Sequence, residues 1–276
     1  MNRIARVPVL AAAALSLMLC SAGCKRLEAR DQLNKGVQAY KAAKYEEAIG
    51  HFQRAVNLDP TYPMTRIYLA TAYMQQVVPD LTTPENLKNA KLAIDSYQQV
   101  LQEHPNDINS LKGIASLYMS MDKFDEAKQW QMKVLSVDPQ NAEAAYTIGV
   151  IDWRLAYKNA VSLLKGAGLQ DGGDGNPKAP KGLCQSIQQQ NTAVVAEGLK
   201  FLNMAVQVRP TYDDAMSYLN LMYRRQADLE CGNDAARKSD LAQADTWREK
   251  AMGTRKSNEE KKAAAASGGI VMDQTK

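Results

Sequence analysis

Apolar residues recur along most of the chain with the spacing of amphipathic α-helices. Three segments, at 44–60, 123–139 and 195–210, share one pattern, in which an amphipathic helix ends at a proline. Partner helices with the same period are predicted at 33–40, 67–73, 113–118, 146–153 and 217–223. The pattern therefore predicts an all-α chain of about five helical hairpins.

The spacing and the small and aromatic residues of these hairpins resemble the tetratricopeptide repeat. Pro105 and Pro139 are 34 residues apart, which is the period of that family. The first repeat matches its pattern at Gly36, Tyr45, Ala48, Phe52, Ala55 and Pro60, and the third at Ala115, Tyr118, Phe124, Ala127 and Pro139. The resemblance implies a right-handed α-solenoid of about five hairpins, whose neighbours must stack to bury their apolar faces.

We expect the repeats at about 29–62, 63–107, 108–141, 142–212 and 213–253 of a solenoid that spans 24–253. Three of them contain insertions between their first and second helices. The pairs Tyr73–Ala93, Asp152–Gly198 and Tyr223–Ala244 are 20, 46 and 21 positions apart, where the family pattern has nine. All three insertions should project from one edge of the solenoid. Residues 254–276 are expected to be the end of a capping helix and a flexible tail, with disorder beyond Ala266.

The largest insertion contains the segment LQDGGDGNPKAPKGLCQ, at 169–185. A calcium loop needs oxygen ligands at its first, third and fifth positions and a glutamate at its twelfth. Counting from Asp171 or from Asp174 does not supply them, so we predict no metal site. The segment is interpreted as a flexible turn at the tip of a protruding hairpin.

Cys184 and Cys231 are the two cysteines that lie well inside the predicted fold. Helices that run back and forward from Arg209-Pro210 would carry both thiols to the same end of two antiparallel helices, at about 35 and 29 Å with a rise of 1.5 Å per residue. We therefore predict a disulfide between them, as an oxidising compartment allows. The alternative is two free or intermolecular thiols.

The N-terminus has the features of a signal peptide at 1–23. Arg3 and Arg6 precede an apolar run from Val7 to Cys20, and small residues follow. The run is shorter than the roughly 20 residues that a membrane-spanning helix needs. The chain is thus expected to be exported.

Ala22, Gly23 and Cys24 resemble the lipobox of bacterial lipoproteins, although Ser21 stands where that family usually has leucine. The resemblance implies that Cys24 is acylated and anchors a periplasm-facing protein to a membrane of the cell envelope. Because Lys25 is not aspartate, the resemblance favours the outer membrane over the inner membrane. Cleavage near Ala22 or Gly23 to give a free periplasmic protein is the alternative.

Charge and composition argue against several classes of function. Removal of Arg3 and Arg6 with the signal lowers the formal charge from +4 to +2, and the chain has no basic run of the kind that binds nucleic acid. The two histidines, His51 and His104, have no nearby partner at catalytic or ligand spacing. We predict no enzyme activity, no cofactor and no small-molecule substrate.

In tetratricopeptide arrays the first helices of the repeats line a concave groove. Carrying over the groove positions of that family gives Tyr40, Ile67, Met74, Met119, Tyr146, Trp153, Arg154 and Arg224. A row rich in methionine and aromatic residues suits an apolar peptide or helix as partner. The alternative is that these side chains only pack between helices.

The predicted function is therefore a non-catalytic protein-interaction scaffold, anchored in the bacterial envelope and active in envelope assembly or secretion. The alternative function is a regulator or adaptor of an envelope enzyme, such as a peptidoglycan hydrolase. The fold itself serves many partners, so it does not choose between them.

Overall fold

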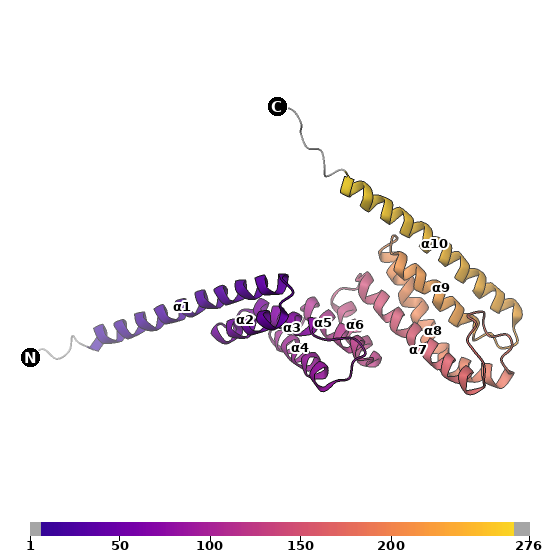
Figure 1. The fold of residues 1–276 in the computed structure, drawn as a ribbon, viewed down its shortest axis with the longest axis horizontal. Helices are drawn as coiled ribbons and strands as arrows, with labels where there is room; N and C mark the ends of the chain where they lie inside the picture. Colours follow the sequence, from indigo (N-terminus) through magenta and orange to yellow (C-terminus); the bar gives the residue numbers. More distant parts are fainter. Residues whose placement is uncertain (1–6, 268–276) are drawn as a thin grey trace, which may run out of the picture. The chain divides into compact units, whose positions relative to one another are not determined.

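The computed structural model describes the backbone of residues 7–267 and the side chains of residues 24–265 (Figure 1). The side chains of the predicted signal peptide lie outside the described residues, and so do residues 268–276 of the predicted flexible tail. All regular secondary structure within 7–267 is helical, which confirms the predicted all-α fold class.

The helices follow one another as hairpins. The first three hairpins are α1 (Val7–Lys41) with α2 (Tyr45–Leu58), α3 (Pro63–Gln75) with α4 (Pro84–Glu103), and α5 (Ile108–Ser120) with α6 (Phe124–Val137). The other two are α7 (Ala142–Gly166) with α8 (Lys181–Val208), and α9 (Asp213–Ala227) with α10 (Asp234–Ser267). α10 thus continues beyond residue 254, into the segment where the sequence predicts the end of a capping helix.

The chain divides into two compact units, Met1–Trp130 and Gln131–Lys276, with the boundary inside α6. In the first unit α1 packs on α2, α2 on α3, α3 on α4 and α4 on α5, and α3 also contacts α1 and α5. In the second unit α7 packs on α8, α8 on α9 and α9 on α10, and α7 also contacts α9. Within each unit the first helices of successive hairpins are therefore neighbours.

Close contact between the helices of the first unit depends on glycines that face aromatic rings. A Cβ atom built on Gly36 of α1 would lie 2.5 Å from the Phe52 ring of α2, which is fully buried. A Cβ atom on Gly113 of α5 would lie 2.5 Å from the Tyr97 ring of α4. A methyl group at either position would force the helices apart or displace the ring.

The insertion of the second repeat is ordered by one buried amide. Asn86, which is 4% exposed, accepts a hydrogen bond from the backbone N–H of Val78 at 2.7 Å. Its Nδ2 donates to the carbonyl oxygens of Val78 at 3.0 Å and Leu81 at 2.7 Å. Thr83 caps the following helix, and Pro84 occupies its first turn.

The close contact at Gly36 can be tested against a second glycine of the same hairpin. Gly36→Ala should lower the free energy of unfolding by about 1–3 kcal/mol, because the methyl group overlaps Phe52. Gly50→Ala is the matched control, since a Cβ atom there meets nothing within 4 Å. It should raise stability by about 0.5–1 kcal/mol through helix propensity. Urea unfolding measures both, and equal effects of the two substitutions would contradict the packing.

Candidate functional site

The first helices of the second unit carry a cluster of aromatic side chains. The ring centroid of Tyr218 on α9 lies 5.6 Å from that of Tyr146 and 5.4 Å from that of Trp153, both on α7. Both pairs meet edge to face, at 80° and 82°. Such pairs are favourable beyond the area that they bury. The structure thus joins two of the predicted groove residues, Tyr146 and Trp153, through a tyrosine that the prediction did not include.

The cluster reaches solvent through Tyr157, one helical turn beyond Trp153 on α7. The two rings stack at 5.3 Å with an interplanar angle of 17°, and Tyr157 is 42% exposed. Trp153 itself is half-buried against the core of the second unit. An aromatic surface therefore extends from the core to the outside of α7.

Two tyrosines near this surface, Tyr146 and Tyr212, have raised pKa values and are neutral at physiological pH. Burial raises the pKa of Tyr146 well above its usual range, and the neighbouring Tyr218 raises it further. Burial also raises the pKa of Tyr212 to about 12, against the opposing charge of Arg209, whose guanidinium lies 4.5 Å from the ring centroid. The surface therefore offers aromatic faces and neutral hydroxyl groups.

In the first unit, three predicted groove residues are half-buried and pack against the hydrophobic core: Tyr40, Ile67 and Met74. Met119 and, in the second unit, Arg154 are half-buried as well. Tyr40, Ile67 and Met74 thus contribute to packing between helices and also keep part of their surface accessible. The sequence left two alternatives for these residues, which were that they line a groove or that they pack between helices. In the structure both descriptions apply to the same residues.

Arg224, the last predicted groove residue, has an internal role in the structure. Its Nη1 donates to the carbonyl oxygen of Gly173 at 2.9 Å, and its Nη2 pairs with Asp245 at 3.1 Å. Its Nε donates to Asn220 at 3.2 Å. Every nitrogen of the guanidinium therefore serves a contact within the chain, and one of them holds the loop between α7 and α8.

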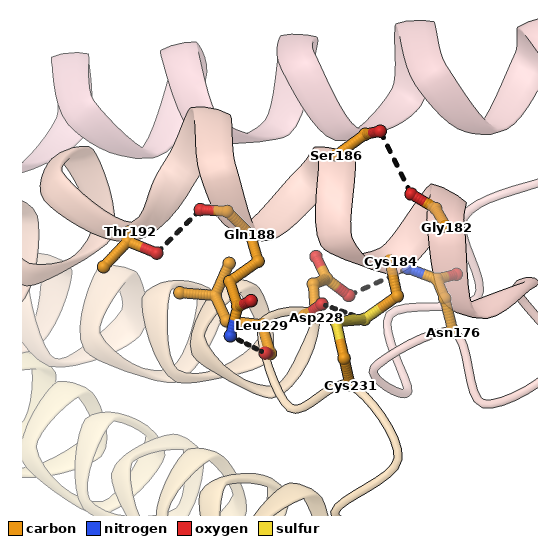
Figure 2. Close-up of a disulfide and its surroundings, with 9 residues drawn as sticks. All are labelled: Asn176, Gly182, Cys184, Ser186, Gln188, Thr192, Asp228, Leu229 and Cys231. Atoms are coloured by element: carbon orange, nitrogen blue, oxygen red, sulfur yellow. Dashed lines mark hydrogen bonds between the residues drawn. A yellow bond between two sulfur atoms is a disulfide. The ribbon is translucent and has the colours of Figure 1, made fainter.

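That loop, residues 167–180, is docked on the second unit, so the expectation of a flexible turn is wrong. Nδ2 of Asn176 donates to Asp228 at 2.8 Å, and Nη1 of Arg237 donates to the carbonyl oxygen of Asp174 at 2.8 Å. Figure 2 shows Asn176 turned towards Asp228 beside the disulfide. The loop folds back onto the end of α9 and the start of α10.

An ion cluster that sequence reasoning missed lies under the loop. Nη2 of Arg225 contacts Asp171 at 3.0 Å and its Nη1 contacts Asp228 at 3.0 Å. The arginine and Asp228 side chains are 4% and 0% exposed. The signal in the sequence was the pair Arg225 and Asp228, spaced i and i+3 at the C-terminal end of α9.

One guanidinium cannot neutralise two carboxylates, so the two aspartates titrate differently. Burial raises the pKa of Asp228 to about 7, against the attraction of Arg225 and with a further increase from the charge of Asp171. Burial also opposes the ionisation of Asp171, but the hydrogen bond and the charge of Arg225 outweigh it and lower the pKa of Asp171. The ion pair is therefore Asp171 with Arg225, and Asp228 holds a proton at mildly acidic pH.

Cys184 and Cys231 form a disulfide beside this cluster, with a Cα–Cα distance of 5.6 Å (Figure 2). Cys184 lies in the first turn of α8, and Cys231 follows α9. The bond closes a segment with a sequence separation of 47. Limiting the unfolded chain in this way stabilises the fold by about 4 kcal/mol.

Among the residues that the structure describes, no three histidine, cysteine or acidic side chains gather in a way that could hold a metal ion. No helix among the same residues is both long and apolar enough to cross a membrane.

The profile of the family "Tetratricopeptide repeat" matches residues 87–151, from α4 into α7. This part of the chain thus matches the tetratricopeptide repeat. Among curated proteins, sperm-associated antigen 1 of Rattus norvegicus is 27% identical over 144 residues, and that of Mus musculus is 26% identical over 144 residues. These matches cover 52% of this chain, which spans only 15% of the length of either relative.

The tetratricopeptide fold extends beyond the matched profile, as solved structures show. The crystal structure of MamA covers 82% of this chain and 96% of its own length, with a TM-score of 0.53 and 13% identity. MamA 41-end from Desulfovibrio magneticus RS-1 covers 83% of this chain and 96% of its own length, with a TM-score of 0.54 and 15% identity. At these identities the likeness shows the fold alone.

Because Asp171 and Asp228 share Arg225, the free energy of unfolding should depend on pH through the titration of Asp228. The folded protein keeps the proton of Asp228 up to about pH 7, whereas the unfolded chain loses it near the ordinary value of 3.8. This contribution to stability is complete below the unfolded pKa and is lost as pH rises through the folded one. It should fall by about 1.4 kcal/mol per pH unit between pH 5 and pH 7.

Urea unfolding of wild type and Asp228→Asn over this range measures that contribution as the difference between the two proteins. Asp214→Asn is the control, because it removes an exposed carboxylate that pairs with Arg255 at 3.0 Å. Its curve should run parallel to that of wild type. Parallel curves for Asp228→Asn and wild type would contradict the assignment.

Proposed function

We propose that the protein is a non-catalytic scaffold that holds a protein or peptide partner on the first helices of its repeats. The supporting observation is the aromatic surface of α7, where exposed Tyr157 stacks on half-buried Trp153. Tyrosine and tryptophan combine large apolar faces with low conformational entropy, and they are enriched at the centres of protein interfaces. The apolar faces of these rings favour an apolar or aromatic segment of the partner over a charged tail.

The non-catalytic part of the proposal is supported by the surroundings of the histidines. Nδ1 of His51 lies 2.8 Å from Oε1 of Gln32 and 3.1 Å from a guanidinium nitrogen of Arg54. His104 caps the end of α4 through its backbone. Neither arrangement resembles a base that is oriented against a nucleophile.

We also propose that Cys24 anchors this scaffold to a membrane of the bacterial envelope, with the outer membrane favoured. The lipobox-like sequence motivates the anchor, and two structural facts are compatible with it. Cys24 is exposed, and α1 runs without interruption from Cys24 to Ala29. The side chain of Ala29 is buried, with an exposed fraction of 6%. A lipid on Cys24 would thus hold the first repeat close to the membrane without a flexible linker. Such a position suits a part in envelope assembly or secretion.

The binding surface is tested by a charge placed on it. Tyr157→Glu puts a carboxylate on the aromatic surface, and it should abolish copurification of the partner that wild type retains from detergent-solubilised membranes. Val208→Glu is the control, since Val208 is 39% exposed on α8, a second helix. It should leave recovery unchanged. Thermal unfolding verifies that both variants fold, and equal recovery of the partner with both would count against the surface.

A further inference from the structure

Exposed apolar side chains gather at one end of the first unit. Leu27 of α1 is 72% exposed, and Tyr62 and Met64 at the start of α3 are 45% and 42% exposed. These two segments are neighbours although they are far apart in sequence, because Arg26 and Arg30 line one small cavity together with Asp59 and Tyr62. α2 carries the chain from the opposite end back to this one.

Basic groups accompany the apolar ones. The side chain of Arg26 is 72% exposed, and its Nε lies 3.9 Å from Asp59. Lys25 and Arg30 are exposed in the same two turns of α1. Leucine, tyrosine and snorkelling basic side chains together are typical of protein surfaces at the boundary between lipid headgroups and acyl chains.

We propose that this end of the first unit, defined by Leu27, Tyr62 and Met64, lies on the membrane surface. The proposal rests on the acylation of Cys24 that is part of the proposed function. Leu27 follows Cys24 by three residues, so it lies on the same face of α1 and about 4.5 Å further along the axis. The headgroup layer of each leaflet is about 5–8 Å thick. With the acyl chains of Cys24 in the bilayer core, Leu27 lies inside that layer.

The continuous helix after Cys24 also explains why the membrane contact is specific to this end of the first unit. The helix between Cys24 and buried Ala29 is continuous, so the anchor fixes the orientation of the first hairpin as well as its distance from the bilayer. Glu28, Asp31 and Asp59 offset the three basic groups. The contact is therefore apolar in its main part and should depend little on the content of anionic lipid.

Lipid photocrosslinking of the mature protein, produced in cells from the full chain, tests this orientation. The protein is reconstituted in vesicles of phosphatidylethanolamine and phosphatidylglycerol, with benzoylphenylalanine in place of Tyr62 or, as the control, of Tyr45. Tyr45 begins α2, about 20 Å away at the opposite end of that helix. Mass spectrometry should find lipid adducts at position 62 and only background at position 45.

The same spectra report the mass of the peptide that carries Cys24, which separates the two proposals. Acylated Cys24 without lipid adducts at position 62, or with equal adducts at both positions, overturns the orientation and leaves the anchor standing. The same variants can be crosslinked in intact cells. A protein adduct in place of a lipid adduct at position 62 there also overturns the orientation. Unacylated Cys24 overturns the anchor, and the orientation falls with it.

Discussion

The structure depends on how closely its helices can approach, and glycines that face bulky side chains set that distance. Gly36 meets Phe52 in the first unit, and in the second a Cβ atom on Gly149 would lie 2.4 Å from Leu202. A Cβ atom on Gly198 of α8 would lie 2.1 Å from Met222 of α9, so the same device joins successive hairpins.

The second unit adds two constraints that converge on one place. The disulfide ties α8 to the segment after α9, and Arg225 draws the loop between α7 and α8 onto the same segment. The guanidinium of Arg225 also lies 5.6 Å from the centroid of the Tyr157 ring. The docked loop and the aromatic surface thus share one buried cation, and the ion cluster supports the exposed end of the proposed binding surface.

The repeat pattern predicts the hairpins well, because small and aromatic residues at fixed spacing determine how two helices pack. The docked loop was not predictable in the same way. Asp171 forms its ion pair with a residue 54 positions later, and no local pattern encodes such a contact. The insertions show the same limit, since part of the residues counted as insertion in the fifth repeat belong to α10, which begins at Asp234. Arg224 fits the groove by its position in the repeat, but tertiary contacts direct it to the loop.

The proposal depends most on Cys24, because both the location of the scaffold and the orientation of its first hairpin rest on a lipid at that residue. The most direct measurement is the mass of the mature N-terminal peptide, combined with fractionation of wild type and Cys24→Ser. An anchored scaffold predicts a chain that begins at an acylated Cys24 and sediments with membranes, and a Cys24→Ser variant that is released. An unmodified N-terminus, or membrane sedimentation that Cys24→Ser leaves unchanged, would contradict it.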